Sequence, residues 1–133
     1  MYCGDEIGAL VADVGSSSAR FGYAGEDCPK TIVPTVEGRL SGAEETSRYV
    51  HGATNLSVRR DHLELCKPLE NGLIEDWDAL ERLWSFVRRE ELPSDALELP
   101  LVLATAPHED MEKRADLVEL MFEKVGVPAL YVV

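Results

Sequence analysis

The sequence predicts an α/β fold in which a mixed sheet is flanked by helices and carries a small inserted subdomain. Three observations support this prediction. Short apolar runs broken by tight turns open the chain, its middle is polar, and two segments of helical periodicity enclose an apolar strand in its second half. With 133 residues, 45% of them hydrophobic, the chain can bury one ordinary core.

The opening strands are expected to form an antiparallel meander. Residues 7–14 are apolar, partly β-branched and followed by a glycine, so they predict a buried strand. Residues 19–23 predict a short return strand, and residues 31–33 predict a third strand. Small and turn-forming residues at 15–18 and 25–29 connect these strands, which favours tight hairpins.

The middle of the chain predicts a separate unit. Residues 38–67 are polar, rich in small residues and contain only brief apolar pieces, which indicates a small subdomain or a long insertion with two strands. Residues 68–72 predict a turn that returns the chain to the core. Residues 1–133 are therefore expected to form one partial domain, with its core in about 1–37 and 68–133.

Two long helices and one more strand are predicted after this insertion. Residues 75–91 predict the first helix, with Asp76 as its N-cap and with Arg88 and Arg89 near its end, where cations favour the helix dipole. Its core-facing residues recur at three- and four-residue spacing: Trp77, Leu80, Leu83, Trp84 and Val87. Residues 99–104 are continuously apolar, which predicts a strand covered on both faces.

The second helix is predicted over residues 109–125. Its inner side is expected to comprise Ala115, Val118, Met121, Phe122 and Val125. Gly126 is suited to end the helix, and Pro128 prevents its continuation. Residues 130–133 begin another strand or helix, so we expect the chain to be an N-terminal fragment of a longer domain.

The charge and the rarer residues exclude several classes of function. A formal net charge of −12 argues against a nucleic-acid binder and suits contact with proteins, including basic surfaces such as histones. No apolar run approaches the ~20 residues that span a bilayer, and the first residues lack a basic start and a long apolar run, so we expect no secretory leader and no membrane partner. The cysteines Cys3, Cys28 and Cys66 form no CxxC pair, which favours a reduced intracellular compartment.

The histidines give no sign of a metal or catalytic site. His51, His62 and His108 share no spacing of a metal site or a catalytic triad. We therefore expect each of them at the surface or in a helix cap.

The first hairpin carries the residues best suited to chemistry. A turn of small residues exposes backbone N–H groups and hydroxyls that form a concave anion site. Arg20 on the return strand can add a fixed positive charge, and Asp13 at the end of the first strand can hold Mg²⁺ through water. No Walker motif is present. A purely structural turn is the alternative that these residues leave open.

Four blocks occur in an order that resembles the actin family. They are ALVADVGSSSARFGYAGEDCPK, PLENGLIEDWDALERLW, LVLATAP and LMFEKVGVPALYV. Arg20 stands where conventional actin has Lys, and the middle region is short and diverged. These details, together with GYAGEDCPK, resemble the nuclear actin-related members more than conventional actin.

The resemblance implies an actin-like ATPase fold of the ribonuclease H-like type, with only the first of its two lobes present. In that family the lobes clamp ATP and a divalent ion between them. The resemblance assigns metal binding to Asp13, and phosphate binding to Gly15, Ser16, Ser17, Ser18 and Arg20. Ser17 and Ser18 depart from the Gly-Leu of conventional actin. The second phosphate hairpin and the water-orienting residue belong to the absent lobe, so we expect no catalytic residues and no enzyme activity in this chain.

The family also implies a role. We expect a nuclear subunit of chromatin-remodelling or histone-acetyltransferase complexes, with ATP and Mg²⁺ as structural ligands. Its partners would be other subunits, actin and histones or the nucleosome, without sequence-specific binding of nucleic acid. The alternatives are a cytoplasmic, filament-forming ATPase of the cytoskeletal type and a truncated regulatory fragment. Because the family returns covering helices to this lobe from its C-terminal part, one sheet face is expected to be exposed.

Overall fold

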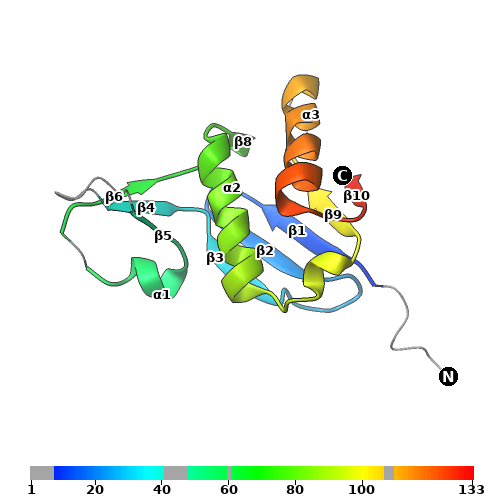
Figure 1. Cartoon of the computed structure of the whole chain (residues 1–133), viewed down its shortest axis with the longest axis horizontal. Coiled ribbons are helices and arrows are strands. Elements are labelled where there is room, and N and C mark those ends of the chain that lie inside the picture. The colour runs from blue at the N-terminus through cyan, green and yellow to red at the C-terminus, as the bar shows by residue number, and fades with distance from the viewer. Residues whose placement is uncertain (1–7, 41–47, 60, 107–109) are drawn as a thin grey trace.

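The computed structural model describes residues 8–40, 48–59, 61–106 and 110–133. Its centre is a mixed five-stranded sheet with the order β10-β9-β1-β2-β3 (Figure 1). Strands β1 (Leu10–Val14), β2 (Ser18–Tyr23) and β3 (Thr31–Pro34) form the antiparallel meander that the sequence predicts. Strands β9 (Leu101–Ala104) and β10 (Leu130–Val132) run parallel to β1.

Both predicted long helices are present. Helix α2 (Trp77–Phe86) continues into a wider π turn over Val87–Glu91, and Asp76 caps it by accepting a hydrogen bond from the Ala79 amide. Helix α3 (Met111–Leu120) likewise continues into a π turn over Met121–Val125. A short 3-10 turn over Ala96–Glu98 precedes β9.

The ends of the second helix are also defined by single residues. The Asp110 side chain accepts a hydrogen bond from the Lys113 amide and so caps the start of α3. Gly126 follows its last turn with φ 82°, a left-handed conformation that glycine adopts without steric cost. The start predicted at residue 109 lies outside the described residues.

The two helices cover the same face of the sheet and build the main core with it (Figure 1). Trp84 of α2 packs edge-on against Phe21 of β2, with ring centroids 5.2 Å apart and an interplanar angle of 81°. The remaining fully buried members come from alternate strand positions, from the helices and from the 3-10 turn: Leu10, Ala12, Ala19, Val33, Leu80, Leu83, Val87, Ala96, Leu101, Leu103 and Met121. The predicted inner face of the first helix is confirmed for these residues, with Trp77 half-buried.

The predicted inner face of the second helix is wrong in part. Met121 and Val125 are buried, but Ala115 is exposed and Phe122 is 44% exposed. Leu117 takes the buried position instead, at 4% exposed. The helix carries two apolar rows, and the position of the sheet decides that the row of Leu117 and Met121 is buried and the row of Ala115 and Phe122 is not.

No described helix covers the other face of the five-stranded sheet. Ile32 and Tyr131 on this face are 58% and 68% exposed, while Val11 and Val102 are half-buried. The prediction that residues 99–104 are covered on both faces is therefore wrong for the described part of the chain, because both long helices lie on the side of Leu101 and Leu103.

Residues 37–66 contain a second, three-stranded sheet with the order β5-β4-β6, where the sequence predicts only two strands. Its strands are β4 (Glu37–Leu40), β5 (Arg48–Val50) and β6 (Leu63–Cys66). A single helical turn, α1 (Ala53–Leu56), follows β5. Gly38 leaves space that three side chains fill, because a Cβ there would lie 2.8 Å from Leu63, with Leu56 and Val50 just beyond.

A two-stranded ribbon leads back to the core. Strands β7 (Leu69–Glu70) and β8 (Leu73–Ile74) pair across a turn in which Asn71 and Gly72 both have positive φ, at 53° and 80°. Among the described helices, none has the length and apolar character needed to cross a membrane.

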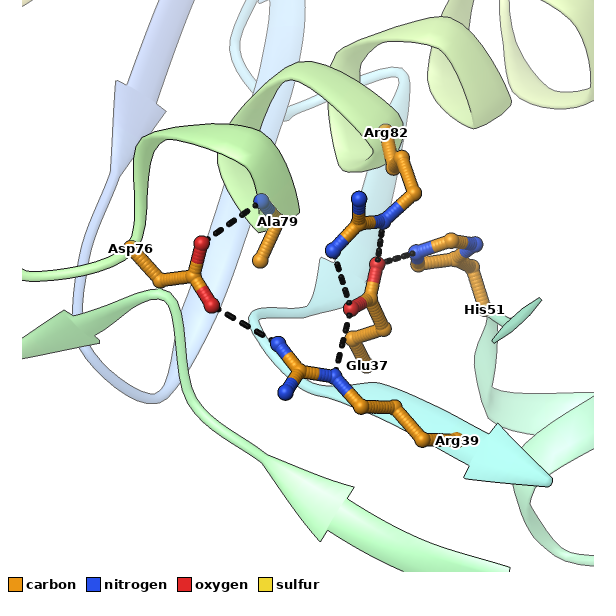
Figure 2. A network of polar contacts seen from close by, with 6 residues as sticks. All are labelled: Glu37, Arg39, His51, Asp76, Ala79 and Arg82. Atoms are coloured by element: carbon orange, nitrogen blue, oxygen red, sulfur yellow. Dashed lines mark hydrogen bonds and ion pairs between the residues drawn. The ribbon is translucent and has the colours of Figure 1, made fainter. Parts of the chain in front are cut away.

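One histidine departs from its predicted place at the surface. His51 is only 7% exposed and lies beside the buried carboxylate of Glu37, in a network with Arg82 of α2 (Figure 2). The prediction fails because the burial of His51 depends on partners far away in the sequence. His62 is exposed, as predicted, and His108 lies outside the described residues.

Candidate functional site

The register of the first hairpin brings the predicted metal and phosphate residues together. Asp13 on β1 lies directly opposite Arg20 on β2, and both side chains project from the uncovered face of the sheet. Arg20 Nη1 lies 3.6 Å from Asp13 Oδ2, and both side chains are more than half exposed, at 55% and 54%. The hairpin therefore presents one acid and one base side by side, immediately below its turn.

Three hydrogen bonds fix the turn that joins these strands. The Gly15 amide donates to the Ser18 carbonyl at 3.0 Å and closes the loop. The Thr35 amide donates to the Ser17 carbonyl at 3.1 Å, and the Gly72 amide donates to Ser16 Oγ at 2.6 Å. Two more distant segments therefore hold the turn from outside, and its conformation does not depend on the hairpin alone.

These bonds leave several donors of the turn unused. Within the described residues, the backbone amides of Ser16 and Ser17 donate to no acceptor, and Ser17 is exposed. Ser16 Oγ accepts from Gly72 and keeps its own proton to donate. Adjacent free amides and hydroxyls at a tight turn are the donors that bind phosphate oxygens.

Gly15 has a steric role in the same turn. A Cβ at this position would lie 3.3 Å from the Ser18 carbonyl oxygen, the atom that closes the loop. A side chain there would therefore press on that oxygen. Ser18 begins β2, opposite Pro34 of β3, and lies on the same side of its strand as Arg20.

The pairing of Asp13 with Arg20 suits an exchange of partners. An exposed ion pair contributes only about 0.2–1 kcal/mol. Each side chain can therefore leave the other at little cost, Arg20 for a phosphate and Asp13 for a hydrated Mg²⁺. No three acidic, histidine or cysteine side chains of the described residues gather into a metal site. Asp13 alone fits the way Mg²⁺ is held by one or two carboxylates, water and the phosphates of a substrate.

The space around the hairpin limits what it can bind. An open groove of about 330 Å³ on the uncovered face is lined at one end by Asp13 and Arg20 and at the other by the acidic residues Glu26 and Asp27. An apolar cavity of about 30 Å³, lined in part by Val14 and Gly72, is far too small for a nucleotide. Neither of these two spaces is lined by Gly15, Ser16, Ser17 or Ser18, so they offer no space of nucleotide size at the serine turn itself.

Two residues that support the turn escaped the sequence analysis. Gly72 lies 56 residues from Ser16, and a glycine between two short strands reads only as a turn residue. Thr35 is fully buried, and its hydroxyl has no hydrogen-bond partner among the described residues. No local pattern marks either residue, because their roles arise from the packing of distant turns.

The chain is similar to known proteins along nearly its whole length. The model of the family described as Actin matches residues 4–133. Actin-related protein 4 of Arabidopsis thaliana is 36% identical to the chain, over 98% of this chain and 36% of that relative. Actin-related protein 4 of Oryza sativa subsp. indica is 34% identical, with the same 98% and 36% coverage.

A shorter relative is also similar. Actin-related protein 4A of Arabidopsis thaliana is 34% identical to the chain, over 98% of this chain and 99% of that relative. The chain therefore spans 36% of the length of the first two relatives and almost the full length of the third.

Proposed function

The chain belongs to the actin family, and from that premise we propose that it is an actin-related subunit of chromatin-remodelling or histone-acetyltransferase complexes. The observation that carries this proposal is the similarity to proteins named Actin-related protein 4 over 98% of the chain. The net charge of −12 supports it further, because an acidic surface suits contact with histones. The proposed location is the nucleus, and the proposed partners are other subunits, actin and the nucleosome.

Within this role, ATP with Mg²⁺ is proposed as a structural ligand. The free amides of Ser16 and Ser17, together with Arg20, would hold phosphate oxygens, and Asp13 would hold the ion through water. Bound Mg²⁺ would neutralise phosphate charge. We propose that the chain does not hydrolyse ATP, because its described residues supply donors for phosphate from one side only.

Replacing Arg20 with alanine is expected to weaken Mg·ATP binding by about tenfold or more, since a hydrogen bond to a charged group contributes about 1.5–3 kcal/mol and 1.4 kcal/mol corresponds to tenfold. Isothermal titration calorimetry of the whole chain measures this change. The matched control is Arg89→Ala, which removes an exposed arginine, 67% accessible, that pairs with Glu90 on the extension of α2. Equal affinities for the two variants would contradict the assignment of Arg20.

The complex-subunit role is tested by recovering the tagged chain from nuclear extract and identifying the proteins that accompany it. Remodelling or acetyltransferase subunits are the expected companions. Sedimentation of the purified chain as nucleotide-dependent filaments would instead support the cytoskeletal alternative and overturn the proposal.

A second candidate function is a regulatory chain that occupies a partner of full-length actin-related proteins. One observation favours it, namely the match over 99% of Actin-related protein 4A. The purified chain would then displace a full-length actin-related protein from a shared partner. An absence of displacement at saturating concentration would exclude this function.

A further inference from the structure

The three-stranded sheet is not part of the main hydrophobic core. In the described ranges, the core cluster draws its residues from 10–33 and 69–127 and none from the intervening sheet. The small sheet has its own apolar contacts around Gly38, where Val50, Leu56 and Leu63 converge. Apolar packing therefore holds this sheet together, but other contacts must hold it on the rest of the molecule.

A buried carboxylate supplies the central contact. The Glu37 side chain on β4 is 1% exposed and accepts a pair of hydrogen bonds from Arg82 of α2, at 2.6 Å from Nε and 2.9 Å from Nη2 (Figure 2). Arg39 Nε donates to the same carboxylate at 3.2 Å, and His51 Nε2 lies 3.1 Å from its second oxygen. Glu37 thus links three segments, one of which is the long helix.

Further contacts tie the same sheet to the same helix. Arg39 Nη2 donates to Asp76 Oδ2 at 2.7 Å, and Asp76 also caps α2 (Figure 2). The guanidinium of Arg82 lies 3.9 Å from the centre of the Tyr49 ring. Each of these contacts joins the small sheet to α2 through a charged side chain.

One further contact between the small sheet and α2 joins two aromatic rings. The His51 ring lies against Phe86, with centroids 5.6 Å apart. Gly52 follows with φ 90°, and a Cβ there would lie 2.8 Å from the Phe86 ring. The chain after β5 therefore approaches α2 closely only because position 52 is a glycine.

We propose that the cluster of Glu37, Arg39, His51, Asp76 and Arg82 is a latch that fixes the small sheet on α2 in one orientation and releases it when Glu37 or His51 gains a proton. The carboxylate is the only described acceptor that all three of Arg39, His51 and Arg82 share. Losing its charge would deprive Arg82 of its paired acceptor and Arg39 of one of its two acidic partners, while Asp76 would still accept from Arg39. This inference does not depend on nucleotide binding.

The protonation states agree with a latch that is closed near neutral pH. Burial alone raises the pKa of Glu37, but the hydrogen bonds from Arg82 and Arg39 outweigh it and leave that pKa below its ordinary value. Burial lowers the pKa of His51, and the hydrogen bond with Glu37 opposes this only in part. A proton on His51 would also face the positive charges of Arg82 and Arg89. His51 is therefore neutral at pH 7 and donates its Nε2–H to Glu37.

The direction of the pH effect follows from these shifts. Both groups bind fewer protons in the folded chain than in the unfolded chain, so acid weakens the arrangement. The contribution of His51 to folding stability is complete above its ordinary pKa of about 6.5. It is lost as the pH falls through the pKa of His51 in the folded chain, which is lower. The contribution of Glu37 is lost in more acidic solution.

Residual dipolar couplings of backbone amides test the latch in the whole chain, because they report the orientation of each sheet. At pH 7, one alignment tensor is expected to fit the amides of both sheets. In Glu37→Gln at pH 7, or in the natural chain as the pH is lowered stepwise from 7, the couplings of residues 37–40 and 63–66 are expected to shrink by about twofold or more, while those of residues 10–14 and 101–104 are expected to stay unchanged. The matched control is Glu90→Gln, which neutralises an exposed carboxylate on the same helix extension.

Three outcomes would overturn the latch. The first is a shared orientation of both sheets in Glu37→Gln, and the second is no effect of acid on the natural chain. The third is loss of both sheets together in Glu37→Gln, which would make Glu37 a requirement of folding. The double variant Glu37→Met/Arg82→Leu adds an independent test. It replaces the charged pair with apolar groups and is expected to weaken the effect of acid, so a response to pH equal to that of the natural chain would also overturn the proposal.

Discussion

Trp84→Ala is expected to lower the free energy of unfolding by about 3–5 kcal/mol, the range for truncating a large aromatic side chain in a core. Trp84 is 2% exposed and packs edge-on against Phe21, so its loss leaves a cavity between α2 and the sheet. Phe21 is the neighbour of Arg20, and the cavity would therefore also loosen the strand that carries the proposed phosphate contact. Urea unfolding followed by far-ultraviolet circular dichroism measures the change.

Trp77→Ala is the matched control for this prediction. Trp77 lies at the start of the same helix but is only half-buried, and it packs at the edge of the core. Its truncation is expected to be clearly less destabilising. An equal loss in both variants would show that helix α2 depends on its tryptophans for a reason other than packing against Phe21.

Arg82→Met is expected to lower the free energy of unfolding by about 3 kcal/mol at pH 7, because it leaves the buried Glu37 carboxylate without its paired donor. The value lies at the lower end of the range for a broken buried pair for two reasons. The Arg82 side chain is 29% exposed, and Arg39 and His51 still donate to the carboxylate. Urea unfolding at pH 7 measures this loss.

Two controls separate the buried pair from a general loss of positive charge. Arg89→Met removes an arginine from an exposed pair with Glu90 and is expected to change stability by less than about 0.5 kcal/mol. Glu37→Met/Arg82→Met removes both charges and is expected to recover much of the loss, since apolar groups can replace a buried pair. If Arg82→Met lowered the free energy of unfolding by no more than Arg89→Met does, the prediction for Arg82 would be contradicted.

The local elements could be predicted because their signals lie within a few residues. Alternating strand residues, the Asp76 cap and the glycine after the second helix all act on neighbours, and the structure confirms them. The order of the actin-like blocks predicted the fold, and the family match confirms it. The six predicted site residues do lie together, since all of them fall within one hairpin, from Asp13 on β1 through the turn to Arg20 on β2.

The tertiary contacts could not be predicted in the same way. Glu37, His51 and Arg82 meet only after the chain has folded back on itself, and each alone reads as an ordinary polar residue. The second helix shows a different limit. Leu117 and Phe122 lie on separate apolar rows, and only the position of the sheet decides which row is buried.

The one-sided sheet has a consequence for the heat capacity of unfolding. Apolar side chains such as Ile32 and Tyr131 are already hydrated in the folded chain, at 58% and 68% exposed, so unfolding transfers less new apolar surface to water. The heat-capacity change is therefore expected to fall below the usual value of about 12–15 cal/mol/K per residue. A shallow dependence of stability on temperature follows, and a partner that covers this face would steepen it.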